Sequence, residues 1–243
     1  MVSKKKILVT GGAGFVGTNL IKLLLDKTKY QILSIDNYSS GKKSNHIKSS
    51  RVSYFKGETT NISNIIKNPK NIKTIFHFGE FARIYQSFSH MNECIISNSV
   101  GSSAVFSFCL ENKIKLIYSA TSASLGNKGR DKNLSPYAFT KAKNLELLEN
   151  LKKWFKFKYE VIYFYNVYGP YQISKGKMST VIGIFEDHYK RKKPLPVVRP
   201  GTQSRRFTHI FDTINVCFFA WKKNLCRHYS ISNNKTYSIY EVA

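Results

Sequence analysis

The sequence is poor in cysteine and has no long apolar run. Its 243 residues include four cysteines, with neither CxxC spacing nor a neighbouring histidine cluster: Cys94, Cys109, Cys217 and Cys226. This pattern disfavours a metal site and predicts reduced thiols in a cytoplasmic protein. We expect no membrane-spanning segment, because no stretch is apolar for long enough. The apolar run that follows the lysines at 4–6 stops after three residues, which disfavours a secretory signal.

Acidic residues are also scarce. Asp and Glu number 14 against 39 Lys and Arg, so the formal net charge is +25. Clustered Lys and Arg can neutralise nucleic-acid phosphates, but here they are scattered and no nucleic-acid motif accompanies them. The densest group, residues 190–193, is expected at a solvated helix end. We therefore favour a compositional bias over a nucleic-acid role, although the same field would attract a small polyanionic substrate.

A strand, a glycine-rich turn and a helix follow one another near the N-terminus. Residues 7–9 form an apolar run typical of a strand buried on both faces. Gly11, Gly14 and Gly17 come next, and apolar residues then recur at helical spacing. This order predicts a dinucleotide site: Gly11 makes the tight turn, Gly14 lets the backbone approach the pyrophosphate, and Gly17 lets helix and strand pack closely. The helix N-terminus would then face the anion.

A second predicted strand, residues 30–35, ends directly before Asp36. This carboxylate lies 19 residues after Gly17, close to the ~20-residue offset of the acid that binds the adenosine ribose. An acid at this point repels a 2′-phosphate. The pair of features therefore predicts NAD rather than NADP as the cofactor.

Further strands and helices alternate along the chain. We expect strands at 52–55, 74–78 and 115–119, a short helix at 62–66 and a longer helix from about Cys94 to Cys109. Glu58 follows the first of these strands, where a loop can contact adenine. The alternation predicts an α/β fold with a doubly wound parallel sheet.

A candidate acid–base pair opens the helix that Pro136 begins. Tyr137 and Lys141 are four residues apart, so they share one face of that helix. A nearby ammonium stabilises tyrosinate, and we therefore expect the pKa of Tyr137 to be lowered towards neutrality. A hydroxyl from the end of the preceding strand would bridge substrate and tyrosine.

With these motifs in place, the chain resembles the extended short-chain dehydrogenase/reductase family, specifically its nucleotide-sugar epimerases and dehydratases. The resemblance covers nearly the whole chain. It includes the glycine turn, Tyr137 with Lys141, and the stretches at 34–37, 76–79, 163–170 and 205–212. It implies a Rossmann-type domain at 1–165, followed by a partial substrate-binding lobe at 166–243 that is interleaved with the last sheet elements. Because relatives continue beyond the helix that begins near Tyr237, we expect this lobe to be truncated.

The resemblance also implies residue roles. Thr121 and Tyr137 are expected to be catalytic together with Lys141, which would bind the nicotinamide ribose. Thr121, Asn166 and Arg205 are expected to contact the sugar nucleotide. The predicted NAD contacts are Gly11, Gly14, Phe15, Val16, Gly17, Asp36, Asn37, Glu58, Phe78, Gly79, Asn98, Tyr137, Lys141 and Phe164.

Sequence departures distinguish the possible activities. Dehydratases of the family carry an Asp-Glu pair directly after the catalytic Thr, where this chain has Ser122 and Ala123. Glu58 and Glu80 are the nearest acids by motif, but Glu80 follows a strand and need not reach C6 of the sugar. Arg206 and Phe211 replace acids that are common in the family, which leaves room for an impaired protein that binds NAD or a nucleotide sugar without turnover.

The activity that we predict is NAD-dependent epimerisation of a nucleotide sugar at C4. A UDP-sugar is the expected substrate and a homodimer is possible. A nucleotide-sugar dehydratase or reductase is the nearest enzymatic alternative.

Overall fold

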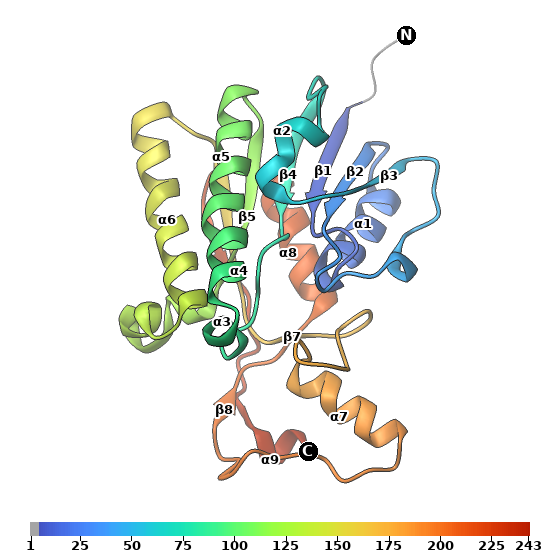
Figure 1. Cartoon of the computed structure of the whole chain (residues 1–243), viewed down its shortest axis with the longest axis vertical. Coiled ribbons are helices and arrows are strands. Elements are labelled where there is room, and N and C mark those ends of the chain that lie inside the picture. Colours follow the sequence, from blue (N-terminus) through green and yellow to red (C-terminus); the bar gives the residue numbers. More distant parts are fainter. Residues whose placement is uncertain (1–4) are drawn as a thin grey trace.

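A parallel sheet forms the centre of the structure, a computed structural model in which residues 5–243 are described, apart from the side chains of 126–129 (Figure 1). Every pairing in this sheet is parallel, and the spatial order is β10-β6-β5-β4-β1-β2-β3. The strands are β1 (Lys6–Thr10), β2 (Gln31–Asp36), β3 (Val52–Lys56), β4 (Ile72–His77), β5 (Lys115–Thr121), β6 (Tyr159–Phe164) and β10 (His228–Ser230). This is the strand order of a dinucleotide-binding sheet, and it confirms the predicted fold class.

Helices cover both faces of the sheet. Side chains alternate along β1, so Ile7 and Val9 pack in one apolar cluster and Leu8 packs in the other. The first cluster includes α1 (Phe15–Lys27) and α8 (Ile210–Lys223). The second includes α2 (Ile62–Ile65), α5 (Ser102–Glu111) and α6 (Pro136–Phe155). In Figure 1, α5 and α6 lie in front of the sheet and α8 lies behind it.

The helix expected from Cys94 to Cys109 is longer and less regular than its sequence predicts. After α3 (Gln86–Ser89), helical backbone runs through α4 (Met91–Ile95), a π-helical segment (Ile96–Gly101) and α5. By length and composition alone, Met91–Glu111 is apolar enough to cross a membrane. The expectation that no stretch is apolar for long enough was therefore wrong. The helix packs against α6 and contributes Val105 and Phe106 to the core, as a core helix of a globular protein does.

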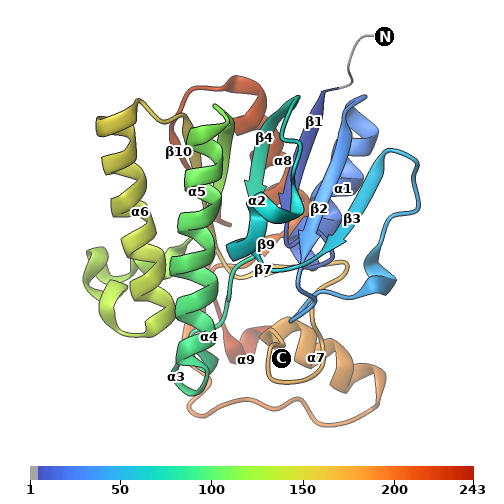
Figure 2. The same ribbon diagram turned by 45° about the horizontal axis from the view of Figure 1, so that its top comes forward.

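A smaller lobe lies beyond the carboxyl ends of the strands (Figures 1 and 2). Its apolar cluster is built on Phe185, Phe207 and Ile239. The lobe contains α7 (Val181–Lys190), the paired strands β8 (Ser204–Arg205) and β11 (Tyr237–Ser238), and α9 (Ile239–Val242). The strands β7 (Val167–Tyr168) and β9 (Thr208–His209) pair with each other. Although they follow residue 166 in the chain, α8 packs on the sheet and β10 pairs within it. The division into a cofactor domain and a substrate lobe at residue 165 stays a prediction.

The loops contain short 3₁₀ helices at Lys43–Asn45, Thr59–Asn61, Ser122–Ser124 and Gly126–Asn133. All four cysteines are free, and three of them are buried.

Lys190 ends α7, which agrees with the helix end predicted for the basic group at 190–193. The cytoplasmic location and the absence of a nucleic-acid partner stay predictions.

Candidate active site

The turn between β1 and α1 is closed by backbone contacts that leave no room for side chains. Gly11 has φ +71°, and a Cβ there would lie 2.9 Å from the backbone of Gly79. A Cβ at Gly17 would lie 2.2 Å from the carbonyl oxygen of Gly11. Gly14 is the N-cap of α1 and, in the described part of the chain, no side chain caps this helix. Its first amides and its positive dipole end therefore remain available to an anion.

Asp36 stands beside this turn at the end of β2. Its carboxylate accepts hydrogen bonds from Ala13 N at 2.9 Å and Tyr38 N at 2.8 Å, one on each oxygen. The side chain is buried, and a Cβ at Gly41 would lie 2.8 Å from it. Because each oxygen has two lone pairs, the carboxylate can accept further hydrogen bonds from two hydroxyl groups. This geometry suits the ribose contact that the sequence predicts.

One cavity of about 980 Å³ joins the glycine turn to the smaller lobe. Its wall includes nearly all of the residues predicted to form the site: Gly11, Gly14, Phe15, Val16, Gly17, Asp36, Asn37, Glu58, Phe78, Gly79, Thr121, Tyr137, Lys141, Phe164, Asn166 and Arg205. Its volume is large for a small-molecule pocket. The fold therefore brings residues that are far apart in the sequence to one concave surface.

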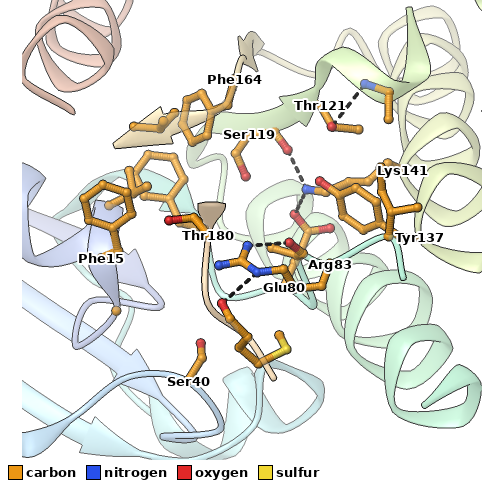
Figure 3. Close-up of a pocket in the computed structure, with 18 of the residues that line it drawn as sticks. Phe15, Ser40, Glu80, Arg83, Ser119, Thr121, Tyr137, Lys141, Phe164 and Thr180 are labelled. Carbon is orange, nitrogen blue, oxygen red and sulfur yellow. Dashed lines mark hydrogen bonds and ion pairs between the residues drawn. The ribbon is translucent and has the colours of Figure 1, made fainter. Parts of the chain in front are cut away.

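Tyr137 and Lys141 project from the first turns of α6 towards the end of β5. Pro136 begins this helix, as predicted, and the hydroxyl of Ser135 accepts a hydrogen bond from Ala138 N at 3.1 Å. Thr121 is the last residue of β5. Figure 3 shows these side chains gathered on one side of the cavity. We call Thr121, Tyr137 and Lys141 the reaction corner.

The ammonium of Lys141 is fully engaged by other groups. It forms an ion pair with Glu80 and donates to the carbonyl oxygen of Ser119 at 2.6 Å. It also lies 4.7 Å from the ring centroid of Tyr118. Only 4% of the Lys141 side chain is exposed. Figure 3 shows Lys141 reaching between Ser119 and Glu80.

The pKa of Tyr137 moves in the direction opposite to the one predicted. Burial, the largest cause, and the negative charge of Glu80 raise it, and the resulting pKa is about 12. The side chain of Thr121 and the charge of Arg83 lower it, but not enough to compensate. The expected tuning by Lys141 is not seen, because the charge of Lys141 is paired with Glu80.

Two charged residues of the cavity wall have roles that the sequence did not predict. The carboxylate of Glu80 binds Lys141 in the reaction corner. Arg83 was not anticipated at all. Its guanidinium donates to the carbonyl oxygens of Met178 at 2.8 Å and Ala82 at 2.7 Å. The position of Glu80 directly after β4 and Gly79 was a usable signal, whereas nothing local distinguishes Arg83 from the other cations.

Asn98 is the one predicted cofactor residue that the structure does not bring to the cavity wall. It lies in the π-helical segment and is completely buried. Its amide exchanges hydrogen bonds with the backbone of Phe81, at 2.7 Å and 3.0 Å, and donates to Thr140 at 3.2 Å. These contacts give it the role of holding the loop after β4.

Side chains at the two ends of the cavity are less constrained. Asn37 donates to the carboxylate of Glu58 at 3.0 Å, at the end near Asp36. At the other end Asn166 donates to the carbonyl oxygen of Arg206 at 2.9 Å, and Arg205 is exposed in β8. Their roles in binding stay predictions.

Comparison with known proteins identifies the family. Residues 7–232 match the model of the NAD dependent epimerase/dehydratase family. The chain belongs to this family. NAD is therefore its cofactor, as Asp36 and the glycine turn predict.

Individual relatives of the family are distant. The chain is 27% identical to ADP-L-glycero-D-manno-heptose-6-epimerase of Brachyspira hyodysenteriae, over 98% of this chain and 79% of the relative. It shares its fold with UDP-glucose 4-epimerase of Thermotoga maritima, with TM-score 0.87, 22% identity and coverage of 98% and 80%. The UDP-N-acetylglucosamine 4-epimerase of Methanobrevibacter ruminantium gives TM-score 0.87, 24% identity and the same coverage of 98% and 80%.

The residues of this epimerase/dehydratase chain fit NAD. Backbone contacts that leave no room for a Cβ at Gly11 or Gly17 close the turn and put Gly14, the N-cap of α1, on the cavity wall, where the free amides of the helix can receive a pyrophosphate. The buried carboxylate of Asp36 suits an adenosine ribose with free hydroxyls and disfavours one that carries a phosphate. Phe78, Gly79 and Lys141 continue the wall from there to the reaction corner.

Proposed function

We propose that this protein catalyses the epimerisation of a nucleotide sugar at C4, through a transient 4-keto sugar. One observation carries the proposal: a single cavity has the dinucleotide turn at one end, Thr121 and Tyr137 within it, and Arg205 at the other end. A nucleotide sugar is elongated and polyanionic, which matches a cavity that extends from an acid–base group to an arginine. We expect a UDP-sugar, since two of the similar structures are named for UDP-sugar epimerases.

Each side chain of the reaction corner has a separate role in the proposed reaction. NAD supplies the hydride acceptor and donor. Tyr137 takes the proton from the C4 hydroxyl and later returns a proton to the keto oxygen. The side chain of Thr121 lowers the pKa of Tyr137, which favours the ionised phenol. Lys141 supplies the ammonium next to this site, and its ion pair with Glu80 holds it in place.

Epimerisation is favoured over dehydration by the side chains that follow Thr121. A dehydration must also expel a hydroxyl group from C6, which needs an acid and a base near that carbon. Ser122 and Ala123 line the cavity where relatives that dehydrate sugars carry carboxyl groups. Glu80 does reach the reaction corner, but Lys141 already binds its carboxylate.

Product analysis tests the proposal. Purified protein with added NAD is incubated with UDP-glucose, UDP-N-acetylglucosamine or dTDP-glucose, and the products are followed by proton NMR. Inversion at C4 supports the proposal, whereas a 4-keto-6-deoxy product overturns it in favour of a dehydratase. Tyr137→Phe should remove nearly all turnover. Tyr159→Phe is the matched control, because Tyr159 is also buried and its pKa is also raised to about 12, but it does not line the cavity.

A second candidate is a protein that binds NAD and a nucleotide sugar without turnover. The observation that favours it is the reaction corner itself, where burial holds the pKa of Tyr137 at about 12 and Lys141 is paired. Bound NAD and bound UDP-glucose, with no inversion at any pH, would establish this function. Turnover that Tyr137→Phe abolishes would exclude it.

A homodimer is the assembly that we propose. Apolar side chains form an exposed stripe along α3, α4 and the π-helical segment: Phe88, Met91, Ile95, Ile96 and Val100. Met91 and Ile95 are four residues apart, as are Ile96 and Val100, so the members of each pair lie on the same side of the helix. Burial against a second copy would remove these side chains from water. Light scattering should give the mass of a dimer for the native chain and of a monomer for Met91→Lys/Ile95→Lys.

A further inference from the structure

Glu80 is a buried carboxylate surrounded by donors. Its side chain is 2% exposed. One oxygen accepts hydrogen bonds from Ser102 at 2.9 Å, from the hydroxyl of Tyr118 at 3.0 Å and from Asn144 at 3.3 Å. The other oxygen binds the ammonium of Lys141. A buried charge with this many partners has a fixed position.

A directional chain of hydrogen bonds supports Glu80 from the glycine turn. The hydroxyl of Thr10 accepts from the amides of Phe78 at 3.1 Å and Gly79 at 3.0 Å, so its own hydrogen must point to Nδ1 of His77, at 2.7 Å. Nε2 of His77 must then carry the ring hydrogen and donate to Ser102, at 3.0 Å. Ser102 in turn donates to Glu80.

This assignment requires a neutral imidazole. Burial lowers the pKa of His77 to about 4, with Glu80 raising it and Lys141 lowering it further. Thr10, His77 and Ser102 are all completely buried. The residue that precedes Gly11 is thus linked through fixed donors to the lysine of the reaction corner.

The charges around Tyr137 come from several elements. Glu80 and Arg83 lie in the loop after β4, Lys141 lies on α6, and the thiol of Cys94 lies on α4. His77 on β4 is neutral, and Tyr118 on β5 keeps its proton because burial and Glu80 raise its pKa. Since Glu80 cancels the charge of Lys141, Arg83 is the cation left to favour the tyrosinate.

We propose that Glu80 is a positioning residue for the reaction: it holds the ammonium of Lys141 against Ser119 and cancels its charge, so that Tyr137 keeps its proton in the free protein. The hydrogen-bond chain that begins at Thr10 fixes Glu80 in this role. The proposal rests on the proposed function only in naming Tyr137 as the base. The ionisation of Tyr137 can be measured without any turnover.

Glu80→Gln tests the proposal, because glutamine keeps the shape and removes the charge. Tyrosine labelled with ¹³C at Cζ is incorporated into the ligand-free protein, and the signal of Tyr137 is assigned by its loss in Tyr137→Phe. The titration is followed by NMR over the alkaline range in which circular dichroism shows folded protein. We expect the pKa of Tyr137 to fall by about one to three units in Glu80→Gln, as the loss of a like charge and a newly unpaired cation predict. A fall of less than about one unit overturns the proposal.

Glu160→Gln is the matched control. Glu160 is also completely buried, binds Lys115 at 2.7 Å, and does not line the cavity. Its substitution should leave the titration of Tyr137 unchanged. In the active protein, the acidic limb of the pH–rate profile should move to lower pH in Glu80→Gln and stay in place in Glu160→Gln.

A second pair of variants tests the coupling between Glu80 and Lys141 if Glu80→Gln alone does not fold. Lys141→Met leaves Glu80 buried without its cation, whereas Lys141→Met/Glu80→Gln removes both charges. The double variant should have an unfolding equilibrium constant at least about tenfold smaller than the single variant. Equal or lower stability of the double variant in urea would show that the two charges are not coupled, and the proposal would then fail.

Discussion

Mild acid should destabilise this protein through His77. The imidazole is completely buried, accepts a hydrogen bond from Thr10 at Nδ1 and donates one to Ser102 from Nε2. A second proton on the ring, at Nδ1, would clash with the hydroxyl hydrogen that Thr10 donates to this nitrogen. The folded protein therefore resists protonation of His77, whereas the unfolded chain accepts the proton freely.

The magnitude follows from the two pKa values of His77. Burial lowers the folded pKa from 6.5 to about 4. Because the folded pKa is the lower one, this contribution to stability is complete above pH 6.5 and is lost as the pH falls towards 4. The full difference of about two and a half units corresponds to about 3 kcal/mol. Between about pH 7 and about pH 5, the loss in the free energy of unfolding should be about 2 kcal/mol.

Urea unfolding followed by circular dichroism at these two pH values measures the effect. Other groups also titrate in this range, so the native chain is compared with His77→Gln, which cannot take up the proton. The native chain should lose about 2 kcal/mol more than the variant on acidification. His90→Gln is the control, since the side chain of His90 is 41% exposed, and it should behave like the native chain. Equal losses in the native chain and His77→Gln would refute the reasoning.

Four further substitutions test the site. Asp36→Ala should weaken the preference for NAD over NADP in calorimetry, and tighter binding of NADP by the native protein would contradict the assignment of Asp36. Gly17→Ala places a Cβ 2.2 Å from a carbonyl oxygen, so it should lower the free energy of unfolding by about 1–3 kcal/mol and abolish NAD binding. Unchanged NAD affinity would show that the turn can adjust. Thr121→Ala should lower kcat by about tenfold to a hundredfold, less than Tyr137→Phe, because only a hydrogen bond is lost. Arg83→Met should raise the pKa of Tyr137 and lower turnover at neutral pH, because the charge of Arg83 lowers this pKa. Arg83→Lys keeps a positive charge and should restore part of the turnover. The same pKa of Tyr137 in Arg83→Met and Arg83→Lys would exclude this role for Arg83.

Local sequence determined the frame of the site. An apolar strand, three glycines and a helix in direct succession have one common geometry, so the turn at Gly11 and the position of Asp36 were predictable from residues within about forty of the N-terminus. Ser135 and Pro136 likewise predicted where α6 begins. The spacing of four residues was sufficient to put Tyr137 and Lys141 on one face. In these cases the structural cause lies within a few turns of backbone.

Tertiary structure decided what the side chains of the reaction corner do. Spacing along α6 cannot show that Lys141 meets Glu80, because that residue comes from a strand end 61 positions earlier. The same packing turns Asn98 away from the cavity and brings Arg83 into its wall. The pKa of a buried phenol depends on desolvation and on every charge within several ångströms. The sequence therefore determined which residues meet at the reaction corner, and the fold alone determined where their charges and protons reside.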